Sequence, residues 1–311
     1  MIQTQSIQLT ETGRRLGHDL FRYRSPAAAG SLPPSVREGF DSASATGVRA
    51  QAPPDRYVKK WLQLRMSAWR RGRAFDEGVT PDLLKAMDVA TCPVMRTVLT
   101  HGERTGTDWS VDRLNNDGAY AANNLAVIST AANRAKGMLS FDEVLPLSSK
   151  KSSTDGLTPA QWLRLASIML GPCFASKPAQ APTLPLVAPV PLYSVRLAMQ
   201  QIQHVFTNKA ATQSGKNHLI KRFRCAGSTE RSEARLRMLA EAVHTGLKRE
   251  EHAHDVWLQD GVMSALLRWR ETLDDNAWGR AGEVSRCLAG SRIVSPTRLQ
   301  NWALSSRGYL T

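Results

Sequence analysis

The segment from residue 109 to residue 137 constrains the fold more than any other part of this 311-residue chain. A short, partly apolar run around Asp112 is followed at residues 115–118 by Asn-Asn-Asp-Gly, residue types that tolerate left-handed backbone and reverse the chain. Residues 125–128 are apolar and indicate a return strand. Ser129 is suited to cap a short helix after that strand. The order of these signals predicts a strand, a tight turn, a second strand and a helix, which together form a ββα unit.

Polar and basic side chains gather in this unit. Asp112 lies on the first strand, and Asn133 lies inside the helix, where Ala would be more favourable by roughly half a kcal/mol. Arg134 and Lys136 share that helix. One carboxylate and one amide oxygen are sufficient protein ligands for a hard divalent cation, which keeps several waters and stabilises the transition state of phosphodiester hydrolysis. The arrangement therefore suggests a one-metal phosphodiester site.

These residues resemble the HNH endonucleases, in particular the branch of phages and mobile elements. The resemblance covers about residues 57–146, less than a third of the chain, and extends upstream to a basic helix and a short hairpin. Many positions in register make this signal more specific than any single Asp or Asn. The positions that match the core motif in order and spacing are Ser110, Asp112, Arg113, Gly118, Tyr120, Asn124, Ile128, Ser129, Ala132, Asn133 and Lys136.

The resemblance implies a role for each matched polar residue. Asp112 would be the carboxylate ligand and Asn133 the helical ligand of one Mg²⁺ (or Mn²⁺) ion. Asn124 would be structural, because its side chain would tie a loop to a strand through hydrogen bonds. Arg134 and Lys136 are candidate phosphate contacts at the same helix.

The chain departs from the family at Arg113. Members with a strong general base carry His at this place, whereas an Arg side chain stays protonated and cannot take a proton from water. Arg113 is therefore a candidate phosphate clamp, and the base role would pass to metal-bound hydroxide or to another group. His101 and Asp117 are the nearest candidates in sequence. A scaffold that binds DNA without cutting it is the alternative.

The charge of the chain favours a nucleic-acid partner. A formal net charge of +14 and a pI near 10.1 imply an anionic partner, because clustered Lys and Arg release counterions from phosphates. Double-stranded DNA is favoured over RNA. No run approaches the roughly 18 apolar residues of a membrane span, so no membrane partner is expected. A basic, acid-free helix beginning near Arg56 is either a DNA contact or a solvated face. Its candidate contact residues are Lys59, Lys60, Arg65, Arg70, Arg71 and Arg73.

Cysteine and histidine spacing indicates no further metal site. The four cysteines are widely separated, without a C-x-x-C pair, which argues against structural zinc or a disulfide framework and fits a reducing cytoplasm. They are Cys92, Cys173, Cys225 and Cys287. His252 and His254 stand two residues apart, and residues at that spacing point to different sides of a helix. We expect both histidines to be surface residues.

Composition divides the chain into four parts. Residues 1–55, with their Pro, Gly, Ala and Ser, predict a mostly flexible arm, and residues 56–146 an HNH-like nuclease domain. Residues 147–194 read as a linker with one helix, and residues 195–311 as a helical C-terminal domain of unknown role. The predicted class is α+β, a small ββα-metal (HNH-like) nuclease domain with flanking helices followed by a mainly α-helical C-terminal domain.

Helix starts are marked by capping residues. Thr80, Ser140 and Thr158 each precede a helical pattern, and the last two belong to capping boxes. Residues 174–193 are rich in Pro and Ala and predict an extended linker. Ser295-Pro296 predicts the start of a final helix.

Three functions remain open at this point. The first is a metal-dependent DNA endonuclease that hydrolyses phosphodiester bonds. The second is a non-catalytic nucleic-acid-binding protein on a degenerate HNH scaffold. The third is an adaptor whose function lies in the helical C-terminal domain.

Overall fold

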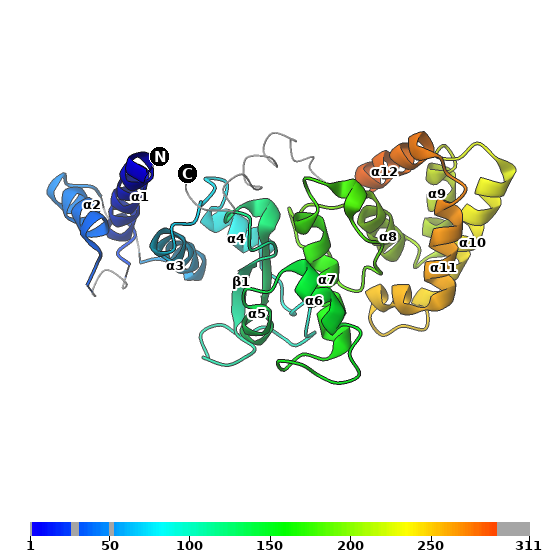
Figure 1. Ribbon diagram of the computed structural model, residues 1–311, viewed down its shortest axis with the longest axis horizontal. Coiled ribbons are helices and arrows are strands. Elements are labelled where there is room, and N and C mark those ends of the chain that lie inside the picture. Colours follow the sequence, from blue (N-terminus) through cyan, green and yellow to red (C-terminus); the bar gives the residue numbers. More distant parts are fainter. Residues whose placement is uncertain (1, 26–30, 50–52, 291–311) are drawn as a thin grey trace. The chain divides into compact units, whose positions relative to one another are not determined.

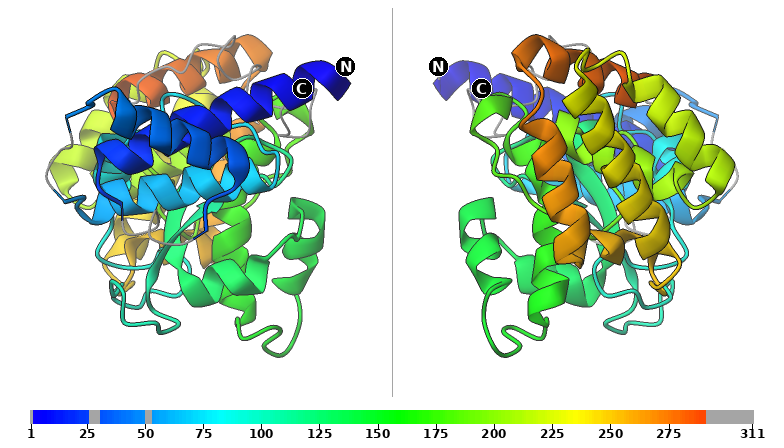
Figure 2. Two further views of the ribbon diagram at one scale, coloured as in Figure 1. Left: turned by 90° about the vertical axis from the view of Figure 1, so that its left-hand side faces the viewer. Right: turned by 90° about the vertical axis from the view of Figure 1, so that its right-hand side faces the viewer.

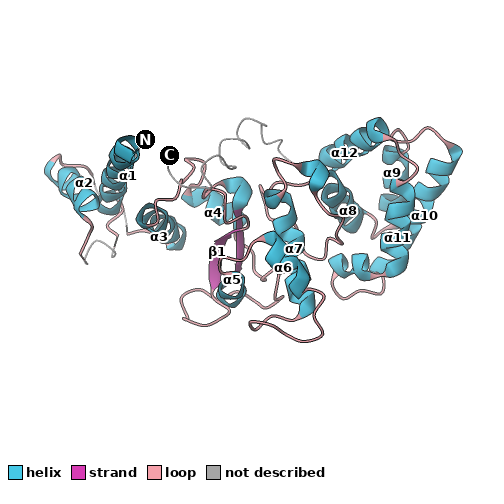
Figure 3. Cartoon of the chain, in the orientation of Figure 1, coloured by secondary structure: helices cyan, strands magenta, loops and turns pink. Residues whose placement is uncertain are grey.

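The computed structural model describes residues 2–25, 31–49 and 53–290. These residues are mainly helical, with one small antiparallel sheet of two strands (Figures 1 and 3), which confirms the α+β class. No helix in these ranges has the length and apolar character needed to cross a membrane. The helix expected at Ser295-Pro296 lies outside the described residues.

In chain order, the elements are α1 (Ile2–Arg22), α2 (Pro34–Ala45), α3 (Arg56–Arg70), α4 (Pro81–Met87), β1 (Trp109–Arg113), η2 (Ala122–Asn124), β2 (Leu125–Ser129), α5 (Thr130–Lys136), α6 (Phe141–Leu147), α7 (Pro159–Cys173), η3 (Pro178–Gln180), α8 (Ala198–Lys209), α9 (Gln213–Phe223), α10 (Glu230–Leu247), η4 (Ala253–Leu258), α11 (Asp260–Arg270) and α12 (Asp275–Ala289).

Two compact units make up the described chain, and they alternate along the sequence. The first holds the described residues of Met1–Val89 together with Asn116–Ala126. The second holds Ala90–Asn115 and the described part of Val127–Ser295. This division differs from the domain boundaries expected from composition, because most of the ββα segment groups with the helices that follow it.

The N-terminal region is helical where the structure describes it. The prediction of a mostly flexible arm is wrong there, because α1 and α2 pack closely against each other (Figure 2, left). Two glycines permit this approach: a Cβ on Gly17 would lie 1.9 Å from the Val36 carbonyl oxygen, and one on Gly39 would lie 1.9 Å from the Arg14 carbonyl oxygen. Buried apolar residues of α1, α2 and α3, together with Leu32 just before α2, form the core of this region, namely Leu16, Leu20, Leu32, Val36 and Leu62.

The two strands and α5 follow the predicted order. Strands β1 and β2 pair, and the Ser129 hydroxyl caps α5 by accepting the Ala132 N–H at 3.2 Å. The connection between the strands is longer than the predicted tight turn, because η2 intervenes before β2. In the first unit, Tyr120 of this connection pairs with Phe75, and its N–H donates to the Ala74 carbonyl at 3.0 Å.

The helices after residue 195 pack together (Figure 2, right), and their buried residues form a core that includes aromatic side chains. Phe223 lies between Phe206 and Trp269, at ring-centroid distances of 5.4 and 5.8 Å. A short 3-10 helix, η4, ends at Leu258, and α11 begins at Asp260. The Pro-rich linker contains the short helix η3 and otherwise no helix or strand, and it is buried in part: Gln203 accepts the Leu186 N–H at 2.7 Å.

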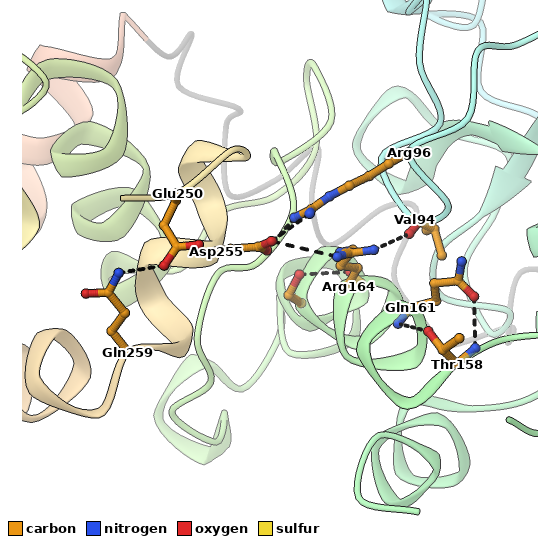
Figure 4. A network of polar contacts seen from close by, with 9 residues as sticks. Val94, Arg96, Thr158, Gln161, Arg164, Glu250, Asp255 and Gln259 are labelled. Carbon is orange, nitrogen blue, oxygen red and sulfur yellow. Dashed lines mark hydrogen bonds and ion pairs between the residues drawn. The ribbon is translucent and has the colours of Figure 1, made fainter. Parts of the chain in front are cut away.

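An ion-pair network joins distant segments of the second unit (Figure 4). Asp255 of η4 accepts both terminal nitrogens of Arg96 and lies 3.8 Å from an Arg164 nitrogen. Arg164 of α7 also donates to the Val94 carbonyl at 3.3 Å. The loop containing residue 96 is thereby held to α7 and η4.

Candidate functional site

The site predicted between β1 and α5 is formed by the facing sides of these two elements. Ser110 and Asp112 are two residues apart, so they lie on the same face of the strand. Asn133 and Lys136 are three residues apart, so they lie on the same face of the helix. Helix α5 packs on β1, and the two pairs therefore meet.

Two side-chain contacts connect the helix to the strand. The Asn133 amide nitrogen donates to the Ser110 hydroxyl at 2.7 Å. The Lys136 ammonium lies 3.0 Å from Asp112 Oδ2 and donates to Asp112 Oδ1 at 3.3 Å. The same ammonium donates to the Arg113 carbonyl oxygen at 2.7 Å. The structure therefore pairs Asp112 with Lys136, and Asn133 with Ser110.

The Asp112–Lys136 pair is buried. Lys136 is 0% exposed and Asp112 is 7% exposed. Burial raises the pKa of Asp112, although Lys136 and then Arg113 act in the opposite direction by favouring the carboxylate. Within the described residues, Asp112 Oδ2 accepts no well-directed hydrogen bond despite its closeness to the ammonium. Lys136 is the ion-pair partner of this carboxylate, and Arg113 adds a smaller stabilisation.

This arrangement does not fit the Mg²⁺ or Mn²⁺ ion that the family resemblance implies. Such an ion would lie about 2.1 Å from a carboxylate oxygen and would keep several waters. Asp112 has little contact with solvent, and its Oδ2 atom lies 3.0 Å from the Lys136 ammonium. Two cations on one side of a carboxylate repel each other. Metal binding at Asp112 would require Lys136 to leave.

The structure corrects the assignment of Lys136 as a phosphate contact. The Lys136 side chain is 0% exposed, and its ammonium donates hydrogen bonds to Asp112 and to the Arg113 carbonyl. It therefore cannot reach a nucleic-acid backbone. Spacing in the sequence places Asp112 on the same face of the strand as Ser110, and Lys136 on the same face of the helix as Asn133, but it does not show that the two faces meet or that Lys136 is buried. Arg134, its neighbour in α5, is exposed and stays a candidate contact.

The remaining predicted catalytic residues lie in different surroundings. Arg113 is 5% exposed, so a phosphate in solution cannot reach its side chain without movement of the protein. His101 is exposed, and its ring packs against the Trp109 ring at 5.5 Å. Asn124 is fully buried and donates to the Ala119 carbonyl at 3.0 Å, a bond within the connection between β1 and β2. Asp117 is exposed and belongs to the first unit.

Helix α3 divides its basic residues between the protein interior and the surface. Arg65 is paired with Asp19 at 2.5 Å and covers the Trp61 ring at 4.4 Å. Arg73, just after the helix, is buried, which corrects its assignment as a DNA contact, and its guanidinium lies 3.4 Å from the Asn116 carbonyl oxygen. Both line a pocket of about 380 Å³ in the first unit.

The surface of α3 therefore presents fewer cations than its sequence suggests. Arg71 is exposed but is engaged by the Ser67 and Tyr120 hydroxyls. Lys59 and Arg70 are exposed, and Lys60 is partly exposed. Lys59 and Arg70 are the α3 residues best placed to contact an anionic partner.

A histidine pair in the second unit was not predicted. His204 of α8 and His254 of η4 lie with ring centroids 6.5 Å apart. The expectation that His254 is a surface residue is wrong, since its Nε2 is buried and has no hydrogen-bond partner among the described residues; His252 is exposed as predicted. Burial and, to a smaller extent, the positive charge of Arg196 lower the pKa of His204 to about 4. Burial and, to a smaller extent, electrostatic repulsion from His204 and Arg96 lower the pKa of His254 to about 4.

Comparison with known proteins adds no relative: no family model, no curated protein and no solved structure matches the chain.

Proposed function

We propose that this chain is a DNA-binding protein on an HNH-like ββα scaffold, and that it does not cleave DNA. The observation that carries this proposal is the buried ion pair of Asp112 and Lys136. A cleaving site needs its carboxylate open to a divalent cation and to water. Here an ammonium from the protein itself neutralises that carboxylate.

The charge of the chain supports DNA as the partner. The formal net charge is +14, and exposed cations lie on elements of both units, among them Lys59 and Arg70 in α3 and Arg134 in α5. Each phosphate contact by such a side chain releases counterions and makes affinity fall with salt. Contacts of this kind supply affinity without base specificity.

A metal-dependent endonuclease is the second candidate function. The observation that favours it is that Asp112 and Asn133 lie on the facing sides of β1 and α5, the elements to which the family resemblance assigns the metal ligands. This alternative requires Lys136 to move away from Asp112 when DNA or metal arrives. The two candidates make opposite predictions about cleavage.

The proposal is tested by measuring binding and cleavage on the same preparation. Fluorescence anisotropy with duplex DNA should give an affinity that falls steeply between roughly 50 and 200 mM salt. Supercoiled plasmid should stay intact in Mg²⁺ and in Mn²⁺, as it does in EDTA. Nicking that is stopped by EDTA and by Asp112→Asn would establish the endonuclease instead. Absence of DNA binding at low salt would refute both candidates.

A further inference from the structure

Helices α8 and α9 form a tightly connected pair in the second unit. Three residues, 210–212, join them, which is the length of the turn in helix-turn-helix pairs. The Thr212 hydroxyl caps α9 by accepting the Gly215 N–H at 3.0 Å. Gly215 is needed at its place, since a Cβ there would lie 1.8 Å from the Lys209 carbonyl oxygen. His244 of α10 contacts the Ala210 carbonyl at 2.7 Å and so fixes the turn.

One face of α9 anchors it to the protein. Leu219 and Phe223 are fully buried in the aromatic core, and Ile220 packs against it. Lys216 lies on the same side, is 8% exposed and pairs with Glu241 of α10. The orientation of α9 is therefore fixed by apolar packing and by one ion pair.

The opposite face of α9 is polar and contains no acidic residue. From residue 213 to residue 224 the chain has no Asp or Glu. Lys221 and Arg222 are exposed, and neither has an ion-pair partner within residues 53–290 or the other described ranges. The remaining exposed polar side chains of this face are Gln213, Ser214, Asn217 and His218.

Two of the three glutamates on α10 are already neutralised, and the third, Glu230, forms no ion pair with α9 within the described residues. Glu233 is paired with Arg224 and with Arg237, at 2.7 and 2.6 Å. Glu241 is paired with Lys216. The positive charge of Lys221 and Arg222 is therefore available to an external anion.

We propose that the exposed face of α9 is a DNA-binding surface that enters the major groove of a duplex. A helix fits that groove, and Gln, Asn and Ser side chains can hydrogen-bond to base edges there. Gln213, Ser214 and Asn217 are in the first half of α9, the part of a recognition helix that faces the bases. Lys221 and Arg222 follow in the second half, where they can contact phosphates. This inference rests on the proposed function in so far as both require DNA binding.

The test compares two variants of the full chain that lose the same charge. The first is Lys221→Gln with Arg222→Gln. The matched control is Lys248→Gln with Arg249→Gln, two exposed residues that directly follow α10 and precede Glu250 and Glu251. All four side chains are exposed, so both variants should unfold at the wild-type temperature.

The α9 variant should lose affinity for duplex DNA in fluorescence anisotropy, and its slope of log K against log salt should fall by roughly two. When salt is lowered from roughly 200 to 50 mM, the affinity of the α9 variant for DNA should therefore rise by a factor about ten times smaller than the factor for the wild type. In the wild type, bound duplex should protect Lys221 from acetylation, read by mass spectrometry, more than it protects Lys248.

Two results would overturn the inference while the proposed function stands. One is DNA binding by the α9 variant with an unchanged salt slope. The other is an equal loss in the control variant, which would mean that α9 contributes only to overall charge. If the wild type binds anionic vesicles but no duplex at low salt, the inference and the proposed function both fail.

Discussion

The ammonium of Lys136 lies 3.0 Å from the carboxylate of Asp112, and both side chains are buried between β1 and α5. Desolvating two charges is unfavourable, and their attraction offsets that cost only while both are present. The pair therefore contributes to the register of the helix on the strand, together with the bond from Asn133 to Ser110. Asp112, the residue expected from the sequence to be a metal ligand, is thus paired with the ammonium of Lys136.

Replacing Lys136 with Met should destabilise the second unit by about 3 to 5 kcal/mol, because the Asp112 carboxylate would be left buried without its ion-pair partner. Urea denaturation followed by circular dichroism measures this change. Adding Asp112→Asn to the same variant should recover part of the loss, since the uncompensated charge is then gone. If the double variant is no more stable than Lys136→Met alone, the ion pair is not the cause.

Arg70 and Arg73 should respond differently to replacement by Gln. Arg70 is exposed, so its loss should weaken DNA binding and reduce the salt slope by roughly one without changing the unfolding temperature. Arg73 is 8% exposed, so its loss should lower the unfolding temperature. Anisotropy and thermal unfolding on both variants separate the two roles. Equal effects of the two substitutions on both measurements would contradict this assignment.

The histidine pair should make the protein less stable as pH falls from about 6.5 to about 4. In this window the unfolded chain binds protons at His204 and His254, whereas the folded chain, with both pKa values near 4, does not. At pH 5 the loss is on the order of 2 kcal/mol for each histidine. The difference in unfolding free energy between pH 7.5 and pH 5, measured by denaturation, should be smaller in a His204→Gln, His254→Gln variant than in the wild type. His252→Gln, at an exposed position, is the control and should leave the difference unchanged.

Gly215→Ala should disrupt the connection between α8 and α9. The added methyl group would overlap the Lys209 carbonyl oxygen at 1.8 Å, and the backbone cannot move aside without changing the turn. We expect a loss of roughly 1 to 3 kcal/mol in unfolding free energy, the usual range for inserting a methyl group into a well-packed site. Gly261→Ala, at a position with no atom within 4 Å of the added Cβ, is the matched control. A normal unfolding temperature for Gly215→Ala would show that the turn is adaptable.

Local signals in the sequence predicted the elements that carry their own start and stop residues. Thr80, Ser129 and Thr158 each cap the helix expected after them, and β1, β2 and α5 follow in the expected order. Such signals depend on neighbours within one turn of the chain, so they can be recognised without tertiary information.

Features that depend on contacts between distant residues were not predicted. In the sequence, Pro33 and Pro34 predict an interruption of regular structure in a flexible arm, but they stand at the start of α2. The packing of α2 on α1 depends on Gly17 and Gly39, which are far apart in sequence. In the candidate site, the residue types were recognised but their burial was not. A lysine in a short helix reads as a surface cation, and only the fold shows that Lys136 points inward to Asp112.

The bridge from Arg96 to Asp255 has a consequence for how the protein is made. These residues are 159 positions apart, so during synthesis at about 5 to 20 residues per second the loop around Arg96 waits roughly 10 to 30 s for its acidic partner. The second unit cannot complete this contact until nearly the whole described chain has left the ribosome. In the meantime the apolar residues that await the later helices stay accessible to chaperones and to other nascent chains. A chain that terminates early, before residue 255, would keep the ββα segment and the bond from Arg164 to the Val94 carbonyl, but it would lack the carboxylate that bridges Arg96 and Arg164.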